Sequence, residues 1–181
     1  KCIDTSMGIT PLEGVIMGTR SGSMDPAVVQ YICNNEHISV DEMLTICNKK
    51  SGLLGISGLS SDMRDIDKAA DEGNERANIA RDMLVYGIRK YIGSYAAAMN
   101  GVDVIVFTAG IGENNCALRE RVMQGFEYLG AKLDPAKNAG CREEAVISTD
   151  DSKVKICVIP TDEEIVIARD TLCIVTGKPI E

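Results

Sequence analysis

The stretch Val102–Asn114, VDVIVFTAGIGEN, most constrains what this chain can fold into. Apolar β-branched residues fill most of Val102–Phe107, which is typical of a buried strand in a parallel sheet. Gly110 and Gly112 then predict a sharp turn that lets the backbone approach a ligand, and the apolar spacing of residues 116–129 predicts a following helix. A strand, a glycine turn and a helix start together form a common cradle for a nucleotide or phosphate.

The glycine turn matches neither of the two common nucleotide-binding motifs. A Walker loop requires a lysine after its last glycine, and a dinucleotide-binding loop requires a third small residue where this chain has Asn115. On spacing alone, an ordinary strand-to-helix turn is therefore an equal alternative.

The composition fits a soluble globular domain and argues against two classes of partner. The chain has 181 residues, 45% hydrophobic and 25% charged, which is enough for one domain with a real core. Its 27 acidic and 19 basic residues give a formal net charge of −8, which opposes nonspecific binding to nucleic acid or an anionic membrane. No apolar run approaches membrane length, and the opening residues KCIDTSMG do not resemble an export signal. We therefore expect a cytoplasmic protein with no nucleic-acid or membrane partner.

The cysteines and the single histidine argue against several kinds of site. The seven cysteines are odd in number and none has C-x-x-C spacing, which disfavours a disulfide scaffold or a zinc site and favours reduced, mostly buried thiols. His37 is the only histidine, and it lies in the predicted turn NNEHIS between two helices. A surface role is therefore favoured over a catalytic triad or a histidine-rich metal site.

Helical and strand patterns are mixed along the chain, as in an α/β protein. Asp25 before Pro26 predicts a helix start, and Ser39 with Glu42 predicts a capping box. The glycine- and serine-rich stretch 51–65 is predicted to be a loop. The other expected helices are Val28–Cys33, Val40–Lys50, Asn74–Met99 and Glu163–Val175, and the other expected strands are Ala145–Ser148 and Lys155–Ile159. Because so few strands are unusual for an α/β sheet, we expect the chain to be the C-terminal part of a longer protein.

Two polar segments in the first half of the chain could bind a ligand. Arg20 in MGTRSG stands between glycines before a helix start, where a guanidinium could bind phosphate or carboxylate oxygens; a solvated loop cation is the alternative. In SSDMRD, Asp62 could accept a hydrogen bond from a ribose hydroxyl and Arg64 could stack on a base. An ordinary Asx turn explains the same residues.

A third polar segment, PTDEE, precedes the last predicted helix. Thr161 and Glu164 have the spacing of a capping box, which gives Glu164 a structural role. Glu163 has no such role and is a candidate ligand for magnesium, directly or through water. The alternative is an acidic first-turn residue that the helix dipole favours.

Together these segments resemble the acetate kinase family, within the superfamily of acetate and sugar kinases, chaperone ATPases and actin. The sequences DTSMGITPLEGVIMGTRSG, SGLSSDMRD, FTAGIGEN and PTDEEIVIARD occur in the order of the family and span essentially the whole chain. At Ser23 the chain departs from the aspartate that is usual in the family.

The resemblance implies a fold and an activity. The fold is α/β, a ribonuclease H-like or actin-like ATPase lobe with a mixed sheet flanked by helices, incomplete in this chain. The lobe is expected in residues 1–162, and residues 163–181 are expected to form a terminal helix that returns to the missing N-terminal lobe. The implied reaction is reversible phosphoryl transfer from ATP to acetate, giving acetyl phosphate and ADP, by a homodimer with Mg²⁺ as cofactor. The chain alone is expected to be inactive.

The resemblance also assigns site residues. Arg20 corresponds to the arginine that binds the transferred phosphoryl group, and Glu163 to the magnesium-binding glutamate. The two nucleotide-contacting segments correspond to Asp62, Met63 and Arg64, and to Gly110, Ile111, Gly112, Glu113 and Asn114. Propionate or butyrate kinase of the same family is one alternative, and a noncatalytic actin-like nucleotide-binding module is another.

Overall fold

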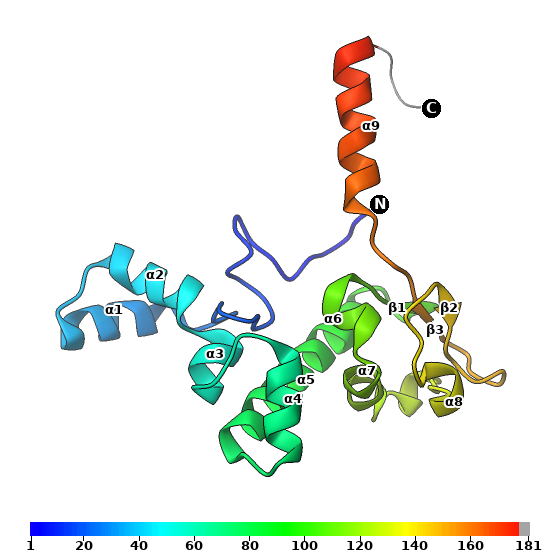
Figure 1. Ribbon diagram of the computed structural model, residues 1–181, viewed down its shortest axis with the longest axis horizontal. Helices are drawn as coiled ribbons and strands as arrows, with labels where there is room; N and C mark the ends of the chain where they lie inside the picture. The colour runs from blue at the N-terminus through cyan, green and yellow to red at the C-terminus, as the bar shows by residue number, and fades with distance from the viewer. Residues whose placement is uncertain (178–181) are drawn as a thin grey trace. The chain divides into compact units, whose positions relative to one another are not determined.

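The computed structural model describes residues 1–177, which form parts of two compact units (Figure 1). The first unit is Lys1–Gly101 and the second is Val102–Glu181. None of the helices between residues 1 and 177 has the combined length and hydropathy of a membrane-spanning segment.

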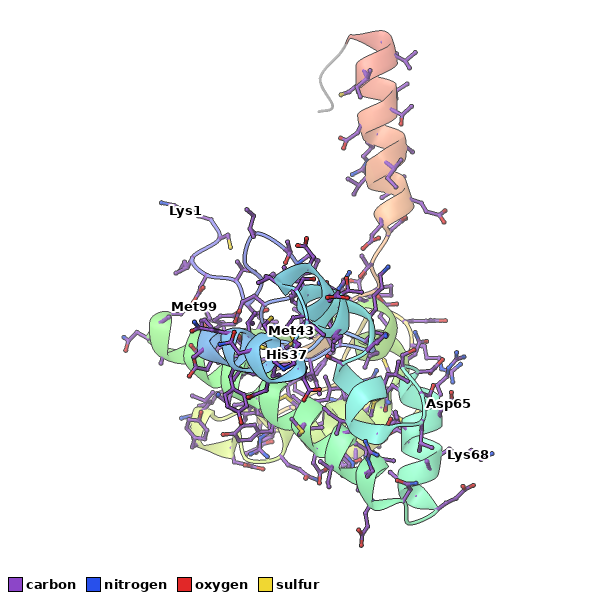
Figure 2. All side chains as sticks on the ribbon, turned by 90° about the vertical axis from the view of Figure 1, so that its left-hand side faces the viewer. Lys1, His37, Met43, Asp65, Lys68 and Met99 are labelled. Atoms are coloured by element: carbon purple, nitrogen blue, oxygen red, sulfur yellow. The ribbon has the colours of Figure 1, made fainter. Side chains whose placement is uncertain are left out.

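The first unit is helical. Two of its helices begin where the predicted capping residues stand: the Asp25 side chain caps the first, and Ser39 and Glu42 form a complete capping box for the second. The longest helix begins at Glu75, one residue later than predicted, and Asn74 caps it. The helices are α1 (Pro26–Glu36), α2 (Val40–Lys49), α3 (Gly52–Ser57), α4 (Met63–Asp71) and α5 (Glu75–Ala98). His37 lies exposed just after α1, as the predicted turn requires (Figure 2).

The prediction of a loop over residues 51–65 was wrong, because this stretch contains α3 and the start of α4. Burial explains the difference: Leu53, Met63 and Ile66 lie in the core of the unit, where α3 and α4 pack against α5. The glycines bound the short helix instead of preventing it. Gly52 at its start and Gly58 after its end both have positive φ, at 59° and 69°, so they supply the bends on either side.

The second unit contains a small mixed sheet and helices. Strand β1 (Val104–Phe107) pairs in parallel with β3 (Lys155–Val158), and β2 (Ala145–Val146) pairs antiparallel with β3, giving the order β1-β3-β2. The helices are α6 (Ala109–Asn114), α7 (Cys116–Met123), α8 (Pro135–Asn138) and α9 (Glu163–Thr176), with the short 3₁₀ helix η1 (Glu127–Leu129) after α7. The predicted strands and the last helix are thus confirmed, with shorter strands than expected.

Three details of the second unit differ from the prediction. β1 is not buried on both faces: Ile105 and Phe107 are buried, whereas Val104 and Val106 alternate with them on an exposed face. The single helix expected over 116–129 ends at Met123, because Gln124 turns extended and the next residue, a glycine, takes a positive φ. The glycine turn itself is the short helix α6 and not an open loop.

The cysteines are free in the described part of the chain. The expectation that they are mostly buried was wrong. Cys47 is buried, Cys2 is exposed and the remaining ones are half-buried.

Candidate functional site

Arg20 lies on a loop that the backbone of α3 holds in place. The loop closes on itself through a hydrogen bond from the Met17 N–H to the Arg20 carbonyl, 3.1 Å. The free N–H groups around the start of α3 then bond to loop carbonyls: Leu53 N–H to Met17 O and Ser51 N–H to Thr19 O, each 2.9 Å. The position of Arg20 is therefore set by main-chain contacts.

The Arg20 side chain is half-buried and remains available to an anion. Its Nη1 atom lies 3.5 Å from Met17 Sδ, and no ion pair of Arg20 is found within residues 1–177. With Thr19, Asn48 and Lys49 it lines a hollow of about 460 Å³ in the first unit. A half-buried guanidinium with no carboxylate partner is suited to bind phosphate or carboxylate oxygens.

The Asp62 carboxylate caps the start of α4. This is the Asx turn that the sequence indicated as the alternative to a ligand-binding role. Its Oδ1 atom accepts hydrogen bonds from the Arg64 N–H, 2.9 Å, and from Arg64 Nε, 3.0 Å. These bonds lower the pKa of Asp62 to about 2, so the carboxylate is charged at neutral pH. The Arg64 side chain is 89% exposed, which leaves the guanidinium face open for stacking.

Met63 cannot serve a nucleotide through its side chain in this conformation. The side chain belongs to the core, with 5% of the residue exposed. A contact from this position therefore has to come from the backbone at the start of α4.

The Arg20 loop and the Asp62 segment lie side by side in the first unit. A methyl group built at Gly18 would stand 2.8 Å from the Ser61 carbonyl oxygen and 3.3 Å from Ser61 Cβ. Two of the predicted site segments, 42 positions apart at Arg20 and Asp62, are thus in backbone contact through their neighbours.

The second segment predicted to contact the nucleotide, residues 110–114, lies within α6. Gly112 packs against the end of β1, because an added Cβ would lie 3.3 Å from the Phe107 carbonyl carbon. Gly110 has no atom within 4 Å of an added Cβ, and Ile111 is 40% exposed. The Asn114 side chain donates to the Gly110 carbonyl, 2.9 Å. An open backbone beside an exposed aliphatic side chain fits the face of a base or ribose.

The turn into α6 is strained at Ala109, the first residue of the helix, which has a φ of 58°. Residues other than glycine, asparagine and aspartate rarely adopt this conformation, and such strain occurs most often at functional sites. Thr161 holds the turn by accepting a hydrogen bond from the Ala109 N–H, 3.1 Å, and by a contact of 2.6 Å with the Thr108 hydroxyl.

The predicted capping box of Thr161 and Glu164 was wrong. The Thr161 hydroxyl is used by the turn before α6, and the Thr161 N–H donates to Glu113 Oε1, 2.8 Å. Asp162 is the N-cap of α9 instead, since its carboxylate accepts from the Ile165 N–H at 3.0 Å. The helix begins at Glu163, as its predicted range requires, and only the capping residue differs from the prediction.

Glu163 has the donor chemistry that magnesium prefers. Its side chain is exposed, and no hydrogen bond or ion pair of its carboxylate is found in the described part of the chain. Residues 1–177 contain no group of three or more side chains that could hold a metal ion. One carboxylate fits Mg²⁺, which in phosphoryl-transfer sites is held by one or two carboxylates together with nucleotide phosphates and water.

Comparison with known proteins decides the family. The model of the Acetokinase family matches residues 1–169. This chain belongs to the acetokinase family. The acetate kinase of Treponema denticola is 56% identical over 175 residues, which cover 97% of this chain and 44% of that protein. The chain thus spans less than half the length of the curated relatives that it matches.

Solved structures of the acetokinase family share the fold. The acetate kinase of Porphyromonas gingivalis matches with a TM-score of 0.89 and 50% identity, covering 94% of this chain and 43% of that one. A propionate kinase from Francisella tularensis matches with a TM-score of 0.85 and 42% identity, over 92% of this chain and 42% of that one. The second unit and its mixed sheet are therefore part of an actin-like ATPase fold, as the sequence predicted.

Sequence reasoning missed one buried polar residue that contacts a predicted site segment. Arg119 on α7 is completely buried, and its guanidinium bonds to the carbonyls of Gly112 and Glu113. The available signal was its helical phase: Arg119 lies three and seven positions before Val122 and Phe126, on the apolar stripe itself.

Proposed function

We propose that this chain is the nucleotide-binding part of an acetate kinase, which transfers the γ-phosphoryl group of ATP reversibly to acetate. The observation that carries the proposal is the Arg20 guanidinium, held by its backbone in a hollow with no carboxylate partner in the described residues and beside the Asp62 segment. Family membership supplies the class of reaction.

The proposed chemistry requires little from the protein beyond positioning and charge. Acetate is already ionised at neutral pH and is a competent nucleophile, so no general base is needed to activate it. Arg20 would bind the transferred phosphoryl group and offset the charge that develops on it. A preorganised charged donor of this kind contributes about 3–4 kcal/mol of barrier lowering.

The remaining site residues would hold the nucleotide and the metal. Arg64 offers an exposed planar cation to the base, and α6 offers an open backbone at Gly110 beside the exposed Ile111. Glu163 would contribute a carboxylate to Mg²⁺, which neutralises phosphate charge when it is bound.

We further propose that the complete protein is a cytoplasmic homodimer that acts on ATP/ADP and acetate/acetyl phosphate, and that the chain alone makes no acetyl phosphate. The net charge of −8 supports the absence of nucleic-acid and membrane partners. The proposed role of residues 163–181 as a helix that packs on another lobe is supported by α9, which buries none of its residues. Residues 178–181 of that segment lie outside the described part of the chain.

The proposal is tested by kinetics of the full-length kinase that carries this segment. Arg20→Ala should lower kcat by a factor of about 100 or more while changing the KM for ATP much less, because the arginine serves the transferred group and not the adenosine. Arg20→Lys should restore activity only in part, since an ammonium cannot make a bidentate contact. Lys68→Ala, which removes an exposed cation of α4 (Figure 2), is the matched control. An unchanged kcat in Arg20→Ala would contradict the proposal.

A propionate kinase is the second candidate, because the structure of the Francisella tularensis enzyme named as such matches with a TM-score of 0.85. A substrate panel of acetate, propionate and butyrate on the full-length enzyme separates the two. A higher kcat/KM for propionate than for acetate would favour the second candidate. ADP binding without transfer to any carboxylate would contradict both.

A further inference from the structure

Arg119 is a fully buried charge in the second unit. Its exposed fraction is 0%, and burial lowers the pKa of its guanidinium. No ion pair of Arg119 is found within residues 1–177; its partners there are neutral oxygen atoms. Burying an unpaired charge costs free energy of folding. Arg119 must therefore supply hydrogen bonds that an apolar side chain could not make.

The five N–H groups of the guanidinium all have partners. Nη1 donates to the carbonyls of Gly112 and Glu113, each at 2.8 Å. Nε donates to Asn138 Oδ1 at 2.8 Å, and Nη2 donates to the carbonyls of Asn138, 3.2 Å, and Cys141, 2.9 Å. An arginine has five such donors, so the side chain is saturated.

The two carbonyls bound by Nη1 belong to the last turn of α6. The last carbonyls of a helix have no partner within the helix and need one elsewhere. α6 has only six residues. The Nε and Nη2 groups of Arg119 bond instead to the end of α8 and to the backbone at Cys141. Asn138, itself 2% exposed, also donates to the Cys116 carbonyl at 2.9 Å. Arg119, on α7, therefore joins the last turn of α6 to the end of α8 and to the backbone at Cys141.

We propose that Arg119 is a positioning residue for nucleotide binding: it fixes the end of α6 so that the backbone of Gly110–Asn114 is preformed for its ligand. The inference rests on the proposed function of α6 as a nucleotide-contacting segment. Arg119 touches no ligand itself. Its contribution is the orientation of a short helix whose last-turn carbonyls, at Gly112 and Glu113, it binds directly.

The geometry selects arginine over lysine at this position. A lysine ammonium has three donors at one point and is strongly hydrated, so it cannot reach oxygens on three different segments. Arg119→Lys should therefore behave more like a loss than a conservative change. This expectation separates a positioning role from a simple requirement for positive charge.

The test uses Arg119→Met and Arg119→Lys in the full-length kinase, with Arg81→Met as the matched control. Arg81 is also a buried arginine, but its partners are Asn78 on α5 and Asp67 and Asp71 on α4, none of which belongs to the predicted segment Asp62–Arg64. Both Arg119 variants should raise the calorimetric Kd for ADP and the KM for ATP by about tenfold, with the KM for acetate changed less than about twofold. Arg81→Met should lower the melting temperature and leave the Kd for ADP unchanged.

Asn138→Ala keeps the test decisive if the Arg119 variants do not fold. It removes one bond that orients the guanidinium and should give a smaller rise in the Kd for ADP, in the same direction. The inference is overturned if the Arg119 or Asn138 variants fold and bind ADP as the wild type does, or if Arg81→Met weakens ADP binding equally. A wild-type enzyme that neither binds ADP nor transfers phosphate would instead contradict the proposed function.

Discussion

Replacement of Gly52 by alanine tests how closely α3 approaches the Arg20 loop. Gly52 has a φ of 59°, and an added Cβ would stand 2.1 Å from the Met17 carbonyl oxygen and 2.7 Å from the Arg20 carbonyl oxygen. The left-handed conformation alone costs an alanine about 1–2 kcal/mol. Relief of the clash must move the loop carbonyls, weaken the Leu53–Met17 hydrogen bond and strain the packing, so we expect a total loss of about 3–5 kcal/mol.

Gly73 provides the matched control for this substitution. Its φ is also positive, at 92°, but an added Cβ would meet no atom within 4 Å. Gly73→Ala should therefore cost only the backbone strain, about 1–2 kcal/mol. The difference between the two variants isolates the contact between Gly52 and the Arg20 loop.

The assay is urea unfolding of the full-length kinase together with steady-state kinetics at a temperature where both variants are folded. Gly52→Ala should have the lower unfolding midpoint and a reduced kcat, because the backbone of Arg20 is displaced. Gly73→Ala should keep its kcat. The reasoning is refuted if the two variants lose equal stability, or if Gly52→Ala is strongly destabilised and still has the wild-type kcat.

Two further predictions concern the capping residues of α9 and α4. Glu163→Gln should raise the Mg²⁺ concentration for half-maximal rate without changing the melting temperature. Asp162→Ala should cost about 0.5–2 kcal/mol of stability and leave the magnesium dependence unchanged. If the two phenotypes are exchanged, Asp162 and not Glu163 is the metal ligand. The pKa of Asp62 is lowered from 3.8 to about 2, so its charge stabilises the folded state above the ordinary pKa and stops doing so as the pH falls through the lower value. The melting-temperature difference between wild type and Asp62→Asn should thus be constant above pH 5 and shrink below about pH 4; a constant difference down to pH 3 would show that the pair with Arg64 does not form.

The parts of the fold that depend on neighbouring residues could be predicted from the sequence. The caps at Asp25 and Ser39 are local hydrogen bonds between residues two or three positions apart, so their spacing is visible in the sequence. The strands β1 and β3 were found for the same reason, since short apolar runs between polar turns mark them.

The errors arose where a distant contact outcompeted a local one. Thr161 has capping-box spacing, but the turn at Ala109 and the Glu113 carboxylate use its hydroxyl and its N–H. α3 forms because Leu53 reaches a buried position that the sequence around it does not reveal. Arg119 was missed because its partners lie on segments up to 22 positions away.

The site residues fall between these cases. Arg20, Asp62 and Glu163 were identified through motif and resemblance, and each has a local environment compatible with its predicted role. Those roles stay predictions. The sequence could not indicate that Gly18 brings the first two segments together, because this contact depends on the path of the chain between them.

The pairing of β1 affects how the isolated 181-residue chain should behave in solution. Within residues 1–177, β1 pairs with β3 along one side only, so the backbone groups on its other side face no strand. Val104–Phe107 contains no charge and no proline, the features by which natural proteins discourage strand addition. A preparation of the isolated 181-residue chain should therefore self-associate through this open edge as its concentration rises, and Val106→Lys on the exposed face should delay that association.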